Sequence, residues 1–328
     1  MTYKPASKWG GRTDPEEGTA ADRWHHKVQP EAGVTASDPQ VGLLGFACDA
    51  GVRRNKGRLG AAGGPQALRR ALANLAWHGA DKLTLRDYGT VEVADDALEA
   101  GQQALALKVA QALPEVRRLL VVGGGHETAW GSFQGLARCH DPATTRIGII
   151  NLDAHFDLRM TGEQGPSSGT PFAQIADYCG PEAFHYCCLG LARSSNTRSL
   201  FERARALGVS YREDRQMRVS DLPAILEQVR RFCKNLDLLY LTIDLDVLPH
   251  YQAPGVSAPA ARGVALDVVQ AVIDEIERIA ATLPLGMPLV EICELNPEFD
   301  QSGVTAKTAA LLADTLLCPS CRPEDDSP

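Results

Sequence analysis

The sequence lacks any apolar run of the roughly 20 residues that a membrane-spanning helix needs, so we expect no such helix. Its first 39 residues are polar and do not follow the basic and then apolar layout of a secretory signal peptide. Positive charge is also not in excess, because 33 lysines and arginines stand against 41 aspartates and glutamates, a net charge of −8. This balance speaks against nucleic acid and anionic membranes as partners.

A disulfide framework and the common nucleotide-binding motifs are missing as well. The nine cysteines are an odd number without regular spacing, and several lie in apolar segments where small buried hydrophobes belong. We therefore expect a reducing, cytoplasmic location. Cys318-Pro-Ser-Cys321 lacks the second pair that a zinc site needs. The absence of a P-loop and of a G-x-G-x-x-G fingerprint argues against a nucleotide-binding α/β protein.

Strand-like apolar runs alternate with segments of helical periodicity along the chain. The expected strands are Val41–Ala47, Leu83–Val93, Arg118–Val122, Ile147–Leu152, Phe184–Leu189, Leu238–Ile243 and Leu289–Glu294. The expected helices are Pro65–Trp77, Asp96–Leu113, Thr128–Cys139, Thr197–Leu207, Leu222–Phe232, Val264–Ala281 and Thr305–Leu317. This alternation, with strands that lack polar alternation, predicts a mostly parallel sheet covered by helices on both faces.

No repeat, low-complexity segment or internal domain boundary interrupts this pattern. With 328 residues, 44% of them hydrophobic, the chain is long enough to bury a sizeable core. We expect a weakly ordered N-terminal segment over residues 1–39, a single α/β domain over 40–318 and a flexible tail over 319–328.

Acidic and histidine side chains directly follow three of the expected strands. The motifs are Val121-Val122-Gly-Gly-Gly-His126, Asp153-Ala-His155-Phe-Asp157 and Asp244-Leu-Asp246. A spacing of two points the side chains of an extended segment the same way, and ligands of parallel sheets lie at the carboxyl ends of the strands. Alone, each motif could be a helix cap, a solvated turn or a structural histidine. Together they predict a site for two divalent cations, which can generate hydroxide from water at neutral pH.

The order and form of these motifs resemble the ureohydrolase superfamily, which includes arginases, agmatinases and formimidoylglutamases, over roughly Val41 to Leu317. The resemblance implies a three-layer α/β/α sandwich, an arginase-like fold, in a homo-oligomer that is a trimer or a hexamer. It also implies two Mn²⁺ per subunit. The first would be bound by His126, Asp153, Asp157 and Asp244, and the second by Asp153, His155, Asp244 and Asp246. Asp157 would also carry protons during catalysis.

Departures from the superfamily pattern point to one branch of it. The first motif reads Gly123-Gly-Gly-His126-Glu127, without the aspartate that many ureohydrolases have before the histidine, and this form resembles formimidoylglutamases. Phe172 stands at about the place of the arginase proton-shuttle histidine, and Ser168 stands where agmatinases typically have histidine.

The loop after the second aspartate motif, residues 255–263, contains no glutamate. In arginase and agmatinase a glutamate there holds the guanidinium of the substrate; counting along the chain places Ala260 at that position and Arg262 two residues on. An arginine would repel a guanidinium and bind a carboxylate with two hydrogen bonds. We therefore expect a small substrate with an amidine-like carbon and carboxylates, namely N-formimidoyl-L-glutamate, hydrolysed to L-glutamate and formamide in histidine degradation.

Other residues are weaker candidates for substrate contacts. They are Ser168, Asn196 and Arg159, and Glu294 is interpreted as a support of the metal ligands or as a structural hydrogen-bond acceptor. The glycine-rich stretch Gly57–Gly64 is interpreted as a turn that covers the site or as simple surface. Two alternatives stay open. One is an amidinohydrolase that releases urea from agmatine, guanidinobutyrate or another guanidino acid. The other is a non-catalytic oligomeric binding protein that retains the fold, which the intact set of six ligands disfavours.

Overall fold

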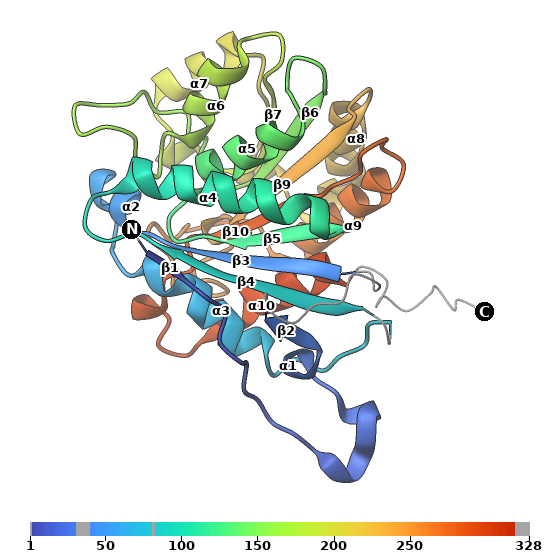
Figure 1. Cartoon of the computed structure of the whole chain (residues 1–328). Helices are drawn as coiled ribbons and strands as arrows, with labels where there is room; N and C mark the ends of the chain where they lie inside the picture. Colours follow the sequence, from blue (N-terminus) through green and yellow to red (C-terminus); the bar gives the residue numbers. More distant parts are fainter. Residues whose placement is uncertain (1, 31–39, 81–82, 319–328) are drawn as a thin grey trace.

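The computed structural model describes residues 2–30, 40–80 and 83–318. In these residues ten strands form one sheet in the order β1-β4-β3-β5-β10-β9-β6-β7-β8, and β2 also pairs with β4 (Figure 1). The strands are β1 (Thr2–Lys4), β2 (Val28–Pro30), β3 (Gln40–Ala47), β4 (Thr84–Glu92), β5 (Arg118–Val122), β6 (Ile147–Leu152), β7 (His185–Leu191), β8 (Ser210–Glu213), β9 (Leu238–Asp244) and β10 (Leu289–Cys293).

The sheet is parallel except at one edge. Among the described strands, β1 alone runs antiparallel to its neighbour β4. All side chains of the central strands β6, β9 and β10 are buried, as expected of parallel strands with helices on both faces. The predicted three-layer α/β/α fold is therefore confirmed.

Two hydrophobic cores lie on the two faces of the sheet. One core takes in side chains of α3 (Gly64–Leu72), α8 (Leu222–Cys233), α9 (Leu266–Ala280) and α10 (Val304–Leu317). The other takes in side chains of α4 (Leu98–Ala112), α5 (Thr128–Cys139), α6 (Pro171–Cys179) and α7 (Arg198–Ala206). Two short helices, α1 (Trp24–Lys27) and α2 (Ala50–Arg54), complete the α-helices of the described residues, in which no helix is long and apolar enough to cross a membrane.

Most expected elements lie within two residues of the observed ones, but α3 ends well before its predicted end at Trp77. After Leu72 the chain instead contacts the N-terminal segment, because the amide of Trp24 donates to the carbonyl of Leu75 at 3.1 Å. Helix α6 and strand β8 were not expected, since each is short.

The N-terminal segment differs from the weak ordering expected for residues 1–39. Over residues 2–30 it adds β1 and β2 to the sheet beside β4. Trp24 is fully buried and its indole donates to Asp314 at 2.6 Å, while the indole of Trp9 donates to Asp87 at 2.8 Å. Hydrogen bonds from two buried tryptophans therefore hold this segment against β4 and α10, although its polar composition suggested disorder. Residues 31–39 and the predicted tail 319–328 lie outside the described residues, and the domain boundaries stay predictions.

Candidate metal centre and its cavity

Four neighbouring strands bring the candidate ligands to one edge of the sheet. The sheet order β5-β10-β9-β6 places the residues after these strands side by side, although they are far apart in sequence. His126 follows β5, Glu294 follows β10, Asp244 ends β9, and Asp153 follows β6. All three pairings between these strands are parallel, so their carboxyl ends meet at the same edge.

The first group of candidate ligands surrounds the imidazole of His126. Its Nδ1 atom lies 3.2 Å from carboxylate oxygens of Asp153 and Asp157 and 3.4 Å from one of Asp244. This nitrogen is fully buried and yet has no hydrogen-bond partner among the described residues. A buried nitrogen with three carboxylate oxygens around it and no hydrogen bond fits a shared cation, because such a group is otherwise costly to bury.

The second group lies around His155. Its Nδ1 atom is 3.0 Å from an oxygen of Asp246 and 3.5 Å from one of Asp153. Ligand atoms of these three residues lie within 4.8 Å of one another, as do those of the first group, and Asp153 belongs to both. Asp244 belongs to the first group only, and its Oδ1 accepts the amide of Asp246 at 2.8 Å. The six predicted ligands are thus brought together, and a bridging role for Asp244 stays a prediction.

Burial and mutual repulsion disfavour the charged form of Asp157 and Asp244, whereas at Asp153 the neighbouring His126 and His155 outweigh burial and lower the pKa. Burial raises the pKa of Asp157 to about 6, and the charge of Asp153 adds to the effect. Burial and the charge of Asp246 raise the pKa of Asp244 well above its usual value. Burial opposes protonation of His126, but the surrounding carboxylates outweigh it and raise its pKa. So much negative charge in a buried cluster is the environment that divalent cations stabilise.

A chain of hydrogen bonds supports His126 from behind. Its Nε2 atom lies 3.0 Å from the hydroxyl of Thr242, which donates to Glu291 at 3.0 Å, and Glu291 also accepts from Ser132. Because Thr242 donates its proton to Glu291, it accepts from Nε2–H, and the lone pair of His126 is left on Nδ1. The chain of hydrogen bonds therefore turns Nδ1, the candidate metal-binding nitrogen, toward the carboxylates.

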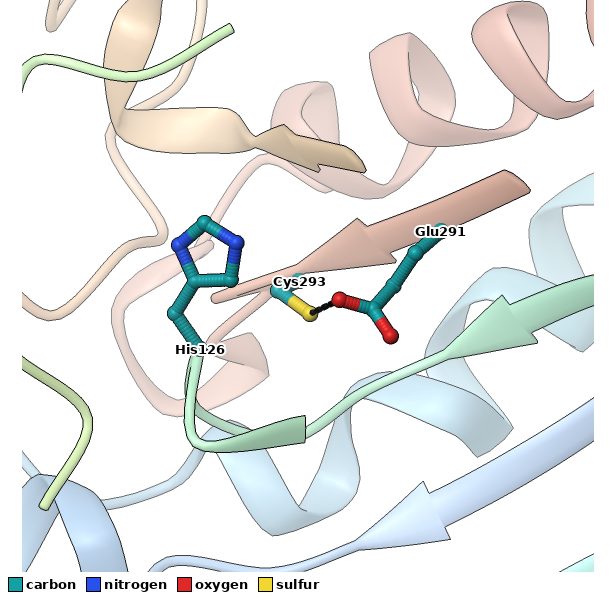
Figure 2. A group of neighbouring side chains, drawn as sticks. All are labelled: His126, Glu291 and Cys293. Carbon is teal, nitrogen blue, oxygen red and sulfur yellow. Dashed lines mark hydrogen bonds between the residues drawn. The ribbon is translucent and has the colours of Figure 1, made fainter. Parts of the chain in front are cut away.

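His126, Glu291 and Cys293 also form a group close enough to hold an ion (Figure 2). The thiol of Cys293 lies 3.4 Å from Glu291 and hydrogen-bonds to it. Burial raises the pKa of the Cys293 thiol well above its usual value, so in the metal-free protein the thiol stays protonated and donates to Glu291. We interpret this group as support for His126.

Glu294 contacts the centre through its side chain. Its carboxylate accepts the amide of His126 at 2.9 Å and the hydroxyl of Ser257. Glu294 and Asp157 have positive φ angles of 67° and 47°, a conformation that non-glycine residues seldom adopt and that is enriched at functional sites.

A cavity of about 300 Å³ opens over the centre. At the end that carries the candidate ligands, its lining includes His155, Asp157, Asp244, Asp246 and Glu294. It also includes three predicted substrate contacts, Arg159, Ser168 and Asn196. The structure thus places most of the predicted site residues around one space.

Arg262, predicted to bind a substrate carboxylate, does not line this cavity. Its side chain is 62% exposed and its guanidinium lies 3.7 Å from the carboxylate of Asp214. The carboxylate that the loop 255–263 lacks is supplied to the cavity by Glu294, from the end of β10. The position of Arg262 therefore gives no reason to exclude a guanidinium substrate.

The other predicted contacts differ in what they can offer a ligand. The amide of Asn196 is fully used: it accepts from Phe156 at 3.0 Å and donates to carbonyls of Ala154 and Ala192 at 2.9 Å. It therefore holds in place the loop that carries the candidate ligands Asp153, His155 and Asp157. The hydroxyl of Ser168 accepts from Asn55 at 3.1 Å, which leaves its own proton for a ligand.

The first two residues of the glycine-rich stretch, Gly57 and Arg58, line the cavity, which favours its interpretation as a turn at the site over simple surface. Three residues just before and within it, Asn55, Lys56 and Arg58, line the cavity and were missed. Two cations within three residues, Lys56 and Arg58, at the start of a glycine-rich turn were the available signal.

Comparison with known proteins agrees with this arrangement. The model of the Arginase family matches residues 39–318. A formimidoylglutamase of Aeromonas hydrophila is 51% identical over 313 residues, covering 95% of this chain and 97% of the relative. One of Vibrio vulnificus is 50% identical over 316 residues, covering 93% and 92%. The crystal structure of formimidoylglutamase from Bacillus subtilis superposes with a TM-score of 0.77 at 21% identity, covering 94% of this chain and 93% of that chain. The crystal structure of Trypanosoma cruzi formiminoglutamase with Mn²⁺ superposes with a TM-score of 0.76 at 24% identity, covering 89% of this chain and 97% of that chain.

Proposed function

This chain belongs to the arginase family, and on that premise we propose that it hydrolyses N-formimidoyl-L-glutamate to L-glutamate and formamide, a step of histidine degradation. Relatives about 50% identical over nearly the whole chain carry the name formimidoylglutamase, which supports the substrate. One structural observation carries the proposal. Two groups of candidate ligands share Asp153, and a cavity lined by cations opens over them.

Two manganese ions per subunit would be held by this centre. One would bind His126, Asp153, Asp157 and Asp244, and the other would bind Asp153, His155, Asp246 and Asp244. The unpartnered Nδ1 of His126 and the mixed imidazole and carboxylate donors support this assignment. When bound, such ions lower the pKa of water and neutralise negative charge that develops on the substrate.

The acidic end of the cavity suits the reacting group of this substrate. A formimidoyl group is an amidine, which is cationic when protonated. Glu294 lines the cavity beside the candidate ligands and offers a carboxylate to it. We assign to Glu294 the orientation of the amidine nitrogen, so that the carbon faces the ligand groups around His126 and His155.

Asp157 is the residue to which we assign proton transfer. It lines the cavity, so its carboxylate reaches the space over the candidate ligands, and a carboxylate placed there can accept a proton and return it. Water adds to the formimidoyl carbon, Asp157 accepts its proton, and the proton passes to the leaving nitrogen of glutamate. The bond between that nitrogen and the formimidoyl carbon then breaks, which yields formamide and L-glutamate.

A second candidate substrate class follows from Glu294. A carboxylate in the cavity could also hold a guanidinium, which would give urea from a guanidino acid. An assay of manganese-loaded protein separates the two, with N-formimidoyl-L-glutamate, arginine, agmatine and guanidinobutyrate in parallel. Glutamate from the first compound alone supports the proposal; urea from a guanidino compound, with no turnover of the first, contradicts it.

The resemblance to ureohydrolases also leads us to propose a homo-oligomer, a trimer or a hexamer, in the cytoplasm. Seven of the eight described cysteines are free and Cys318 is disulfide-bonded, so the proposed location rests on the resemblance and not on the cysteines. Light scattering of the purified protein distinguishes trimer, hexamer and monomer.

A further inference from the structure

We propose that Lys56 determines the specificity of the cavity by binding one of the two carboxylates of the substrate. This inference rests on the proposed function, which supplies a substrate with two carboxylates. It goes beyond that function because it assigns the recognition to a residue outside the metal centre and outside the motifs of the sequence.

The charge around the cavity gives the first step. Three cations line it, Lys56, Arg58 and Arg159, and in the described part of the chain none of them forms an ion pair with a carboxylate. The neighbouring Arg54, by contrast, pairs with Asp96 at 3.0 Å and with Glu99 at 2.6 Å. In a chain with a net charge of −8, cations kept apart from carboxylates at a cavity are suited to an anionic ligand.

Arg58 is engaged by the protein itself. Its guanidinium donates to the carbonyls of Val256 at 2.5 Å and Ser257 at 3.2 Å, and it stacks on Phe299 at 4.0 Å from the ring centre. These contacts join the stretch around residue 58 to the loop after β9. Lys56 and Arg159 are left as the two cations available to a ligand, which matches the two carboxylates of the substrate.

The backbone around Lys56 is anchored before any ligand binds. The carboxylate of Asp49 accepts the amides of Gly60 at 3.0 Å and Ala62 at 2.7 Å. The side chain of Asn296 donates to the carbonyls of Arg58 at 3.1 Å and Leu59 at 2.9 Å. A cation on an anchored backbone loses less freedom on binding, and this favours recognition.

The conformation of Lys56 is unusual for a lysine. Its φ angle is 61°, at the turn that ends α2, where its amide donates to the carbonyl of Arg53 at 3.0 Å. Glycine and asparagine are the residues that favour this position. A lysine at this φ angle does not stabilise the turn. Its contribution therefore lies in the side chain, which lines the cavity.

The test removes the ammonium with variants that suit the turn, Lys56→Gly and Lys56→Asn, and compares them with Arg53→Gln. Arg53 is an exposed cation of the same segment that does not line the cavity. Three substrates are assayed with manganese-loaded enzyme: N-formimidoyl-L-glutamate and its two isosteric amides, in which either the α- or the γ-carboxylate is replaced. We expect both Lys56 variants to lose about 10- to 100-fold in kcat/KM on the diacid, mainly through KM.

The discrimination between substrates separates recognition from a structural effect. Both Lys56 variants should lose the preference for the diacid over one of the two amides and keep it over the other, while Arg53→Gln behaves as the wild type. Unchanged preference over both amides in the Lys56 variants would overturn the proposal. Failure of the wild type on all three substrates would overturn the proposed function, and this inference with it.

Discussion

The Nε2 atom of His126 lies 3.0 Å from the hydroxyl of Thr242, and this contact leaves Nδ1 to face the carboxylates. The hydroxyl in turn donates to Glu291, a carboxylate buried in the middle of the sheet on β10. Because Thr242 and Glu291 are register partners on β9 and β10, the sheet itself sets this chain of hydrogen bonds. The orientation of His126, a candidate metal ligand, is thus specified by strands β9 and β10 behind it.

Replacing Thr242 with valine tests this support. Valine keeps the shape of threonine but offers no oxygen to Nε2–H, so we expect manganese affinity to fall about 10- to 100-fold. Chelator competition measures the affinity without reference to activity. Thr242→Ser keeps the hydroxyl and should restore most of it, and equal affinities in the valine and serine variants would contradict the proposed role.

Metal binding should also stabilise the fold, because the carboxylates around His126 and His155 repel one another without a cation. Manganese at about 100 times its dissociation constant adds roughly 2.7 kcal/mol to the free energy of unfolding. For a chain of this size we expect a rise in Tm of roughly 5 °C, seen by calorimetry with and without chelator. Asp246→Asn should shrink this rise, whereas the exposed control Glu182→Gln should keep it. A Tm that manganese leaves unchanged would contradict the assignment.

Asp157→Asn should lower kcat at saturating manganese by about 10²- to 10⁴-fold, since asparagine cannot take the proton that we assign to Asp157. Asp177→Asn, an exposed change on α6, is the matched control and should turn over normally. Steady-state kinetics and a titration with manganese separate lost chemistry from lost metal. Turnover of Asp157→Asn like that of the wild type would remove Asp157 from the mechanism.

Gly169→Ala probes the placement of Arg159. A Cβ atom at residue 169 would lie 2.9 Å from Cδ and 3.2 Å from Nε of Arg159, and 3.3 Å from the side chain of Asn55. The exposed arginine can move away, so the fold should stay intact while the guanidinium shifts. We expect KM to rise roughly tenfold at nearly constant kcat and Tm. An unchanged KM would mean that Arg159 does not contact the substrate.

The sequence was most informative where acidic and histidine side chains directly follow a strand. His126, Asp153 and Asp244 lie at the ends of apolar runs, and parallel pairing alone is enough to bring such positions together. Their convergence therefore needed no knowledge of the loops.

Loop residues were harder to predict, because spacing along a loop does not tell which way a side chain faces. Arg262 was expected in the site but lies beside Asp214. Arg58 was missed, although it reaches Ser257, a residue 199 positions further along the chain. The buried Trp24 likewise contacts Asp314, and no local pattern reveals such distant partners.

The most direct test of the account follows the carbon that the enzyme attacks. N-formimidoyl-L-glutamate labelled with ¹³C in the formimidoyl group is incubated with manganese-loaded protein and observed by NMR. Our account predicts that the label appears in formamide, with an equal amount of L-glutamate, and that Asp157→Asn slows its appearance. Label in N-formyl-L-glutamate with release of ammonia, or no turnover by the fully loaded wild type, would contradict it.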